Sequence, residues 1–315
     1  MGYPFDPELA AAAVMLADLD ISDLAAARAA QAAELAAAMA EADERGVLVR
    51  EVRVPGRAPG DPEVPLRIYR PADATGRLPA VYSVHGGGFV LGSLDVDHDL
   101  NLRFARELPA VVVAVDYRLA PEHPYPAPLD DVFAGLTWLT RHTAHLDVDQ
   151  GRIALWGDSA GAGLAAGVAL LLRDLGAPPP RHLHLHSPAL DDRLATASAR
   201  RFTDTPVWNR RNAALSWAAY LGAGVPGGAA VPAYAAPARA GQLTGLPPTF
   251  VAVMEFDPLR DEALAFAAAL RAAGVPTEVR RYPGTFHGCA AIGHAGVGQR
   301  INADGLAALR VGLSR

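Results

Sequence analysis

Residues 157–161 read Gly-Asp-Ser-Ala-Gly and contain the serine best placed to act as a nucleophile. An apolar run at 153–156 precedes this motif and an alanine- and leucine-rich run at 162–172 follows it, which predicts a buried strand that passes directly into a helix. So sharp a turn brings the backbone close to itself, and the two flanking glycines supply the missing bulk. Ser159 is therefore expected at the corner, with its hydroxyl pointing out of the turn and the free N–H groups of the helix behind it.

A serine hydroxyl is a weak nucleophile and needs a base, which in turn needs an acid to hold it. In strand-turn-helix sites of this kind the chain order is serine, acid, histidine. His287 lies in a loop directly after the last predicted strand, where a base could reach Ser159. His294 lies among glycines and is expected in a surface loop. His287 is thus the predicted base.

Two carboxylates could hold this base. Glu255 and Asp257 both follow the predicted strand at 250–254, at the edge of the sheet where the base is expected. We favour Asp257 because Pro258 fixes the loop behind it and leaves the carboxylate in a defined turn. Glu255 remains the alternative.

Residues 85–89 read His-Gly-Gly-Gly-Phe and follow an apolar run at 80–84. Attack by a serine on a carbonyl creates a negatively charged oxygen, which backbone N–H groups can stabilise. A glycine run after a strand can direct such groups toward the space above Ser159. His85 precedes the serine, which is the wrong order for the base, so we expect it to hold the loop.

The remaining pattern predicts an α/β fold. Alternating apolar residues at 47–69 suggest two antiparallel strands around a turn. Six further runs that are apolar almost throughout are separated by helix-length segments, which is typical of a parallel sheet covered on both faces. We therefore expect a doubly wound, mostly parallel sheet of about eight strands. The six runs are 80–84, 111–115, 153–156, 183–186, 250–254 and 277–282.

Two segments fall outside this alternation. Residues 1–46 are expected to form two helices, and residues 187–248 form an insertion far longer than an ordinary crossover. An insertion at the carboxyl end of a strand overhangs the functional edge of such a sheet. We therefore divide the chain into cap helices at 1–46, a core at 47–186 and 249–315, and a cap insertion at 187–248.

The composition of the chain argues against some classes of partner and location. The 315 residues are 51% hydrophobic and 20% charged, with a net charge of −6, which argues against nucleic acid or an anionic membrane as a partner. The amino terminus resembles no signal peptide, so the cytoplasm is the expected location. Cys289 is the single cysteine, which excludes an internal disulfide. It is expected to fill the core near His287.

Other polar residues have alternative interpretations. Arg118 and Glu122 could clamp an anionic substrate, but the proline-rich loop that holds them favours an internal ion pair. His182, His184 and His186 share one face of a strand and could bind a metal. Without a cysteine or carboxylate nearby, histidines that face solvent or a helix are favoured, and no metal is expected.

Several ordered motifs together resemble the hormone-sensitive-lipase family of α/β-hydrolases, the bacterial family IV carboxylesterases. The resemblance extends over nearly the whole chain. The sequence departs from the family pattern at Cys289, where an aromatic residue is usual, and at the histidine-rich strand 182–186. The motifs are His85-Gly-Gly-Gly-Phe89, Asp116-Tyr-Arg-Leu-Ala-Pro-Glu-His123, Gly157-Asp-Ser-Ala-Gly161, Asp257-Pro-Leu-Arg-Asp261 and His287-Gly288.

The resemblance implies an α/β-hydrolase fold with a helical cap formed by the N-terminal helices and the insertion. It also implies which residues perform the chemistry. The implied catalytic triad is Ser159, Asp257 and His287, and the implied oxyanion hole consists of the N–H groups of Gly87, Gly88 and Ala160.

We therefore expect a serine carboxylesterase that forms an acyl-enzyme and needs no cofactor. The cap should enclose the site, with Phe89 and Trp208 lining the substrate pocket, so esters with short to medium acyl chains are expected. A homodimer through the edge strand at 277–282 is expected from the resemblance alone. The alternatives are an amidase such as an arylformamidase, which would use the same triad, and a non-catalytic receptor for a small ligand.

Overall fold

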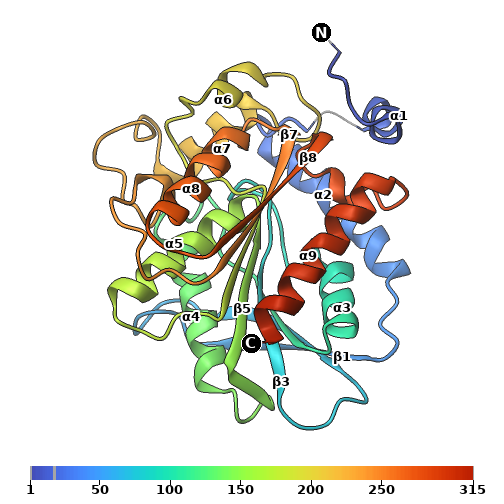
Figure 1. The fold of residues 1–315 in the computed structure, drawn as a ribbon, viewed down its shortest axis with the longest axis vertical. Coiled ribbons are helices and arrows are strands. Elements are labelled where there is room, and N and C mark those ends of the chain that lie inside the picture. The colour runs from blue at the N-terminus through green and yellow to red at the C-terminus, as the bar shows by residue number, and fades with distance from the viewer. Residues whose placement is uncertain (1, 17–18, 315) are drawn as a thin grey trace.

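The structure is a computed structural model that describes residues 2–16 and 19–314, and it contains an eight-stranded sheet with helices on both faces (Figure 1). The strand order is β1-β2-β4-β3-β5-β6-β7-β8. β2 is antiparallel to both of its neighbours, and all the other pairs are parallel. The predicted doubly wound, mostly parallel sheet is confirmed. Its strands are β1 (Val47–Val54), β2 (Val64–Pro71), β3 (Leu78–Val84), β4 (Val111–Val115), β5 (Val148–Asp158), β6 (His182–His186), β7 (Thr249–Phe256) and β8 (Thr277–Phe286).

Burial explains why the central strands are apolar throughout. Every residue of β3 and β4 is buried, because helices cover both faces of the sheet there. β8 lies at the edge of the sheet, and every residue of its first half is exposed or partly exposed. This half accordingly contains three charged residues, Glu278, Arg280 and Arg281.

Helices form a layer on each face of the sheet (Figure 1). α4, α5 and α8 pack on one face, where they share an apolar core with β3, β5 and β6. α3 and α9 pack on the opposite face, against Ala154 and Trp156 of β5. These helices are α3 (His98–Glu107), α4 (Ala127–Arg141), α5 (Ala160–Asp174), α8 (Arg260–Ala272) and α9 (Gly296–Ser314).

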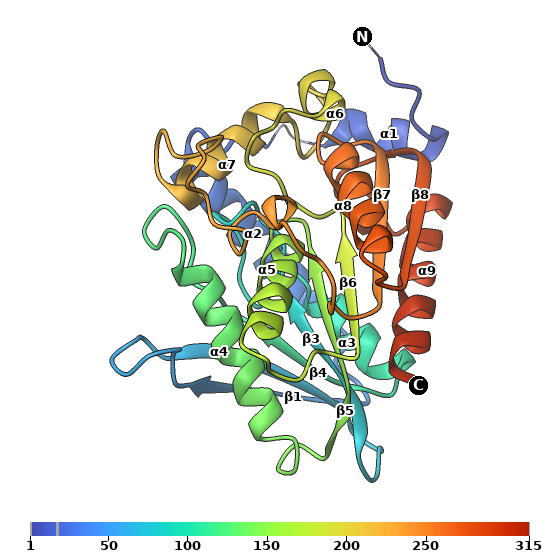
Figure 2. The same cartoon turned by 60° about the vertical axis from the view of Figure 1, so that its left-hand side comes forward.

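The N-terminal helices and the insertion both lie at the end of the sheet to which the central parallel strands point (Figure 2). The insertion contacts the segment between the two N-terminal helices, since Arg211 forms an ion pair of 3.1 Å with Asp20 and Asn212 donates a 2.6 Å hydrogen bond to the carbonyl of Leu19. The division into cap and core remains a prediction. The elements are α1 (Pro7–Met15), α2 (Leu24–Glu41), α6 (Ala197–Arg201), α7 (Arg210–Leu221) and the 3₁₀ helix η1 (Pro237–Arg239), and a second 3₁₀ helix, η2 (Cys289–Ala291), follows β8.

The prediction that Arg118 and Glu122 form an ion pair with each other is wrong, because each of them pairs with a different residue. Arg118 contacts Asp131 on α4 at 2.7 Å, whereas Glu122 contacts Arg28 on α2 at 2.7 Å. The two side chains therefore tie their loop to two different helices. Local sequence could not reveal this, because both partners are remote in the chain.

His182 and His184 face the helix α9, in agreement with one of the two interpretations that the sequence favours. Both are buried, and a Cβ atom at Gly305 of α9 would lie 3.5 Å from the His184 ring. Cys289 is buried in an apolar cluster, as predicted for core filling. In the part of the chain that the structure describes, no helix has the length and apolar character to cross a membrane.

Candidate active site

The corner at Ser159 is as tight as the sequence predicts. β5 ends at Asp158 and α5 begins at Ala160, with Ser159 between them at φ 53° and ψ −115°. A non-glycine residue with positive φ is strained, and such strain gathers at functional sites. A Cβ atom at Gly157 would lie 2.5 Å from the carbonyl oxygen of Gly161, and one at Gly161 would lie 2.2 Å from that of Val84. Both positions therefore require glycine.

Three side chains from separate parts of the chain meet at this corner. The Ser159 hydroxyl lies 2.9 Å from His287 Nε2, and His287 Nδ1 lies 2.7 Å from Asp257 Oδ2. A carboxylate oxygen only accepts hydrogen bonds, so Nδ1 carries the proton and Nε2 can accept the serine proton. The exposed fractions are 4% for Ser159, 5% for His287 and 1% for Asp257, so water is largely excluded from the group.

Glu255, the alternative acid, binds a backbone N–H group and not the imidazole. Its carboxylate accepts a 2.7 Å hydrogen bond from the N–H of Gly284, in the loop that leads to His287. Asp257 Oδ1 accepts a hydrogen bond of 2.8 Å from the N–H of Leu259, which fixes the carboxylate while its other oxygen contacts the imidazole. Asp257 is thus the carboxylate that the fold brings to His287.

The electrostatic surroundings of His287 favour its role as a base. Burial alone would lower the pKa of His287, but the charge of Asp257 and its hydrogen bond outweigh burial, so the pKa is raised from its ordinary value. Asp158 acts in the same direction. The imidazole is thereby prepared to accept a proton from the serine.

The glycine loop lies beside the serine. A Cβ atom at Gly86 would be 3.4 Å from the Cβ of Ser159. Gly87 and Gly88 have φ values of 119° and 60°, and within the described residues their N–H groups have no hydrogen-bond partner. The loop and the first turn of α5, which starts at Ala160, therefore offer free backbone donors on two sides of Ser159.

His85 holds this loop, as the sequence predicts. Its ring stacks on Tyr117 at a centroid distance of 4.2 Å, and the Tyr117 hydroxyl donates a 2.9 Å hydrogen bond to the His85 carbonyl. A Cβ atom at Gly92 would lie 2.4 Å from the imidazole. The glycine run is therefore anchored at the end of β3 and does not behave as a loose turn.

Trp208 and Phe89, which the sequence predicts to line the pocket, have different surroundings. A Cβ atom at Gly88 would lie 2.3 Å from the Trp208 ring, whose centroid is 6.0 Å from that of His287. Trp208 therefore borders both the glycine loop and the base. Phe89 instead stacks on Tyr220 at 4.1 Å and packs against Trp217, which places its ring among the aromatic residues of α7.

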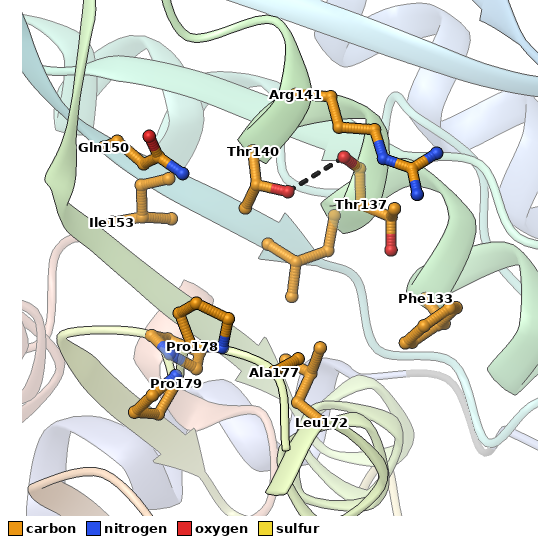
Figure 3. A pocket seen from close by; sticks show the side chains of 12 residues that line it. Phe133, Thr137, Thr140, Arg141, Gln150, Ile153, Leu172, Ala177, Pro178 and Pro179 are labelled. Carbon is orange, nitrogen blue, oxygen red and sulfur yellow. Dashed lines mark hydrogen bonds between the residues drawn. The ribbon is translucent and has the colours of Figure 1, made fainter. Parts of the chain in front are cut away.

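A cavity of about 320 Å³ lies away from these residues (Figure 3). It is formed by α4, the start of β5 and the loop after α5, whereas Ser159 follows the end of β5. Its polar lining comprises Thr137, Thr140, Arg141 and Gln150, and the Thr140 hydroxyl is bonded to the Thr137 carbonyl. The residues that line it include neither a nucleophile next to a base nor a carboxylate, in contrast to the corner at Ser159.

Glu262 supports the site but carries no sequence signal. It is buried on α8, and one of its carboxylate oxygens accepts hydrogen bonds from the N–H groups of Leu190 and Asp191 at 2.7 and 3.1 Å. It thereby ties the start of the insertion to the helix that follows Asp257. In the sequence it reads as an ordinary charged residue in the first turn of a helix.

Nothing in the described chain groups three or more histidine, cysteine, aspartate or glutamate side chains as metal ligands. His182 and His184 face the apolar underside of α9, and Cys289 is buried.

Known proteins are similar to this chain in both sequence and fold. The α/β-hydrolase fold family matches residues 81–291. Carboxylesterase NlhH of Mycobacterium tuberculosis is 40% identical over 76% of this chain and 76% of its own length, and esterase LipI of the same organism is 40% identical over 83% and 82%. The solved structure of a bacterial heroin esterase has a TM-score of 0.97, with 46% identity over 99% of both chains.

The fold, the serine corner and these relatives define a class. The chain belongs to the α/β-hydrolase family, in the hormone-sensitive-lipase group that its motifs indicate. Within that family it is a carboxylic ester hydrolase.

Proposed function

We propose that the protein hydrolyses small carboxylic esters through an acyl-enzyme formed on Ser159. The Ser159 oxygen attacks the ester carbonyl carbon while His287 Nε2 takes the hydroxyl proton. The N–H groups of Gly87, Gly88 and Ala160 stabilise the resulting oxyanion. Collapse of this intermediate breaks the ester C–O bond, and His287 returns the proton to the departing alcohol.

Water completes the cycle. It attacks the acyl-enzyme carbonyl as His287 removes one of its protons, and the second collapse releases the carboxylic acid and restores the Ser159 hydroxyl. Asp257 keeps the imidazole in the tautomer that accepts at Nε2 and stabilises the imidazolium. The observation that carries this proposal is the continuous pair of contacts, 2.9 Å and 2.7 Å, from serine through histidine to aspartate.

The geometry also supports a limit on substrate size. Trp208 packs on the glycine loop beside His287, and the catalytic side chains are buried. Each buried methylene favours binding by about 0.8 kcal/mol only while there is space to receive it. We therefore propose short to medium acyl chains, roughly two to eight carbons, with Trp208 at the limit of the pocket.

A panel of nitrophenyl esters of increasing acyl length tests this proposal. The wild-type kcat/KM should fall beyond about eight carbons, and Trp208→Ala should move the optimum to longer chains because it removes the bulk beside the glycine loop. Ser159→Ala should be inactive on every ester. Trp138→Ala, a change on α4 remote from the site, is the matched control and should keep the wild-type profile. A wild-type kcat/KM that still rises at about sixteen carbons, or activation by emulsified lipid, contradicts the size limit.

A matched anilide added to this panel separates the alternatives. An amidase would hydrolyse the anilide as well as the ester, an esterase would hydrolyse the ester alone, and a receptor would hydrolyse neither while still binding a small ligand. We further propose a cytoplasmic enzyme without nucleic-acid or membrane partners. A homodimer through β8, which is at the edge of the sheet, is also proposed, and light scattering on a sizing column would test it.

A further inference from the structure

The glycine loop continues into residues 89–92, and two side chains of α2 bind its backbone there. Arg28 Nε donates a 2.9 Å hydrogen bond to the carbonyl of Val90. Gln31 Oε1 accepts a 2.9 Å hydrogen bond from the N–H of Gly92. Residues three apart lie on the same face of a helix, so a single face of α2 contacts the loop at two points.

The Arg28 guanidinium also supports the loop through a second backbone segment. Its Nη2 atom donates a 2.9 Å hydrogen bond to the carbonyl of Ala120, and the N–H of Ala120 donates one of 2.9 Å to the carbonyl of Phe89. Glu122 accepts two further hydrogen bonds from the guanidinium, at 2.7 and 2.8 Å. Because the donors of an arginine form a rigid planar fork, the carboxylate that binds two of them also fixes the direction of the others.

Gln31 holds the loop where its two ends meet. A Cβ atom at Gly92 would lie 2.4 Å from the His85 ring, so the backbone of Gly92 lies directly against that imidazole. His85 immediately precedes the glycines. The hydrogen bond from Gly92 to Gln31 therefore fixes the end of the loop that packs on its beginning.

The conformation of the loop requires such support. Gly87, Gly88 and Phe89 have φ values of 119°, 60° and 64° in succession. Phe89 is a bulky residue, for which a positive φ is strained. Strained backbone persists only where the surrounding structure holds it in place. The contacts from Arg28 and Gln31 act on the residues that directly follow this strained turn.

The same turn orients one of the proposed oxyanion donors. The carbonyl of Gly87 accepts hydrogen bonds from the N–H groups of Val90 and Leu91, at 3.1 and 2.8 Å. A trans peptide group is planar, so its C=O and N–H point in opposite directions. The N–H of this peptide group belongs to Gly88. Val90, whose own carbonyl is bound by Arg28, therefore helps to set the direction of the Gly88 N–H.

We propose that Arg28 and Gln31 are positioning residues for the oxyanion hole, which hold residues 89–92 and thereby the direction of the Gly88 N–H. This inference rests on the proposed esterase reaction. Without either side chain the backbone donors would remain, but their directions would vary, and donors stabilise an oxyanion best when they are preorganised. The loss would fall on the transition state, because the oxyanion develops there and is absent from the bound ester.

Steady-state kinetics on a short ester tests this inference. In Arg28→Met, which keeps an unbranched side chain but no donor, kcat should fall roughly ten- to hundredfold with KM within about threefold of wild type. Gln31→Met should lower kcat roughly three- to tenfold. Gln31→Glu keeps an oxygen that accepts from Gly92 and should stay within about twofold of wild type.

Arg211→Met is the matched control. Arg211 also ties the N-terminal segment to the rest of the protein, through Asp20 at 3.1 Å. Its hydrogen bonds among the described residues are made to Asp20 and Ser22, away from the glycine loop. This variant should keep the wild-type kcat and KM, so it separates attachment of the segment from positioning of the loop.

A trifluoromethyl ketone provides a second measurement that a merely structural role would not change. The Ser159 oxygen adds to its carbonyl carbon while His287 takes the proton, and the bound adduct carries an oxyanion. The inhibition constant should rise in Arg28→Met and Gln31→Met by the same factor by which kcat/KM falls. In Gln31→Glu and Arg211→Met it should equal the wild-type value.

The proposal is overturned if folded Arg28→Met and Gln31→Met keep the wild-type kcat and inhibition constant, if the two Gln31 variants are equally impaired, or if Arg211→Met loses as much kcat as Arg28→Met. Should Arg28→Met not fold, the two Gln31 variants decide. If the wild-type protein hydrolyses no ester and forms no ketone adduct, the proposed function itself fails. An active wild type with unaffected variants instead contradicts this inference alone.

Discussion

At the scale of single residues, the site depends on which carboxylate orients one imidazole. The sequence offers two acids after the same strand, and it favours Asp257 through the turn that Pro258 defines. In the folded protein the two carboxylates have different partners. Asp257 contacts His287, and Glu255 accepts a hydrogen bond from the N–H of Gly284. The two oxygens of Asp257 are divided between the base and the N–H of Leu259, so both the imidazole and the turn depend on it.

The first prediction compares these two acids. Asp257→Asn should lower kcat by about four orders of magnitude, because an amide favours the wrong imidazole tautomer. Glu255→Gln should keep activity within about tenfold, since its amide oxygen can still accept from Gly284. Steady-state kinetics on one ester measures both. Loss of activity in Glu255→Gln with an active Asp257→Asn would contradict the assignment.

At the scale of elements, the corner between β5 and α5 determines where the serine lies. Gly161 packs so closely against the carbonyl oxygens of Val84 and His85, at the end of β3, that a side chain there would overlap with backbone. Backbone atoms cannot turn aside as a flexible side chain can. The glycine is therefore required by the approach of two strands and a helix.

Gly161→Ala should accordingly destabilise the protein by about 2 kcal/mol or more and lower kcat, because β3 or α5 must shift. Gly241→Ala is the control: Gly241 has no atom within 4 Å of a built Cβ, and its φ is outside the positive range. Urea unfolding of the two variants measures the free energy of unfolding of each. Equal stabilities for the two variants would show that the corner tolerates a side chain.

The sequence predicted those elements whose signals are local. Apolar runs located the strands, and glycine spacing located the serine corner, because each pattern reflects burial or close approach within a few residues. Contacts between remote segments were not predictable in this way. The pairing of Arg118 with Asp131 and the burial of Glu262 both depend on how separate elements pack.

At the scale of the whole molecule, neutral histidines join the C-terminal helix to the sheet. His182 and His184 lie under α9, where a Cβ atom at Gly312 would be 2.5 Å from the His182 ring. Burial lowers the pKa of His182 to about 4, and that of His184 well below its ordinary value. The unfolded chain therefore binds more protons than the folded one below about pH 6.5.

Stability should consequently fall as pH decreases from about 6.5 toward 4. His182→Leu should reduce the loss of unfolding free energy between pH 7 and pH 5 by about 2 kcal/mol, because this variant removes one such proton site. Urea titrations at both pH values measure the change. His294→Leu, at an exposed histidine, is the control. A pH dependence in His182→Leu that equals the wild-type one would mean that this histidine is not held neutral.

The central claim is that Ser159 is the nucleophile of an esterase, and covalent labelling tests it most directly. A fluorophosphonate should modify one serine per chain, because only Ser159 among the described residues is placed beside His287 Nε2. Peptide mass mapping of the inactivated enzyme identifies the labelled residue. The account predicts one adduct, on Ser159, with ester hydrolysis lost in proportion to labelling. An adduct on another serine, no adduct, or full hydrolysis by completely labelled enzyme would contradict it.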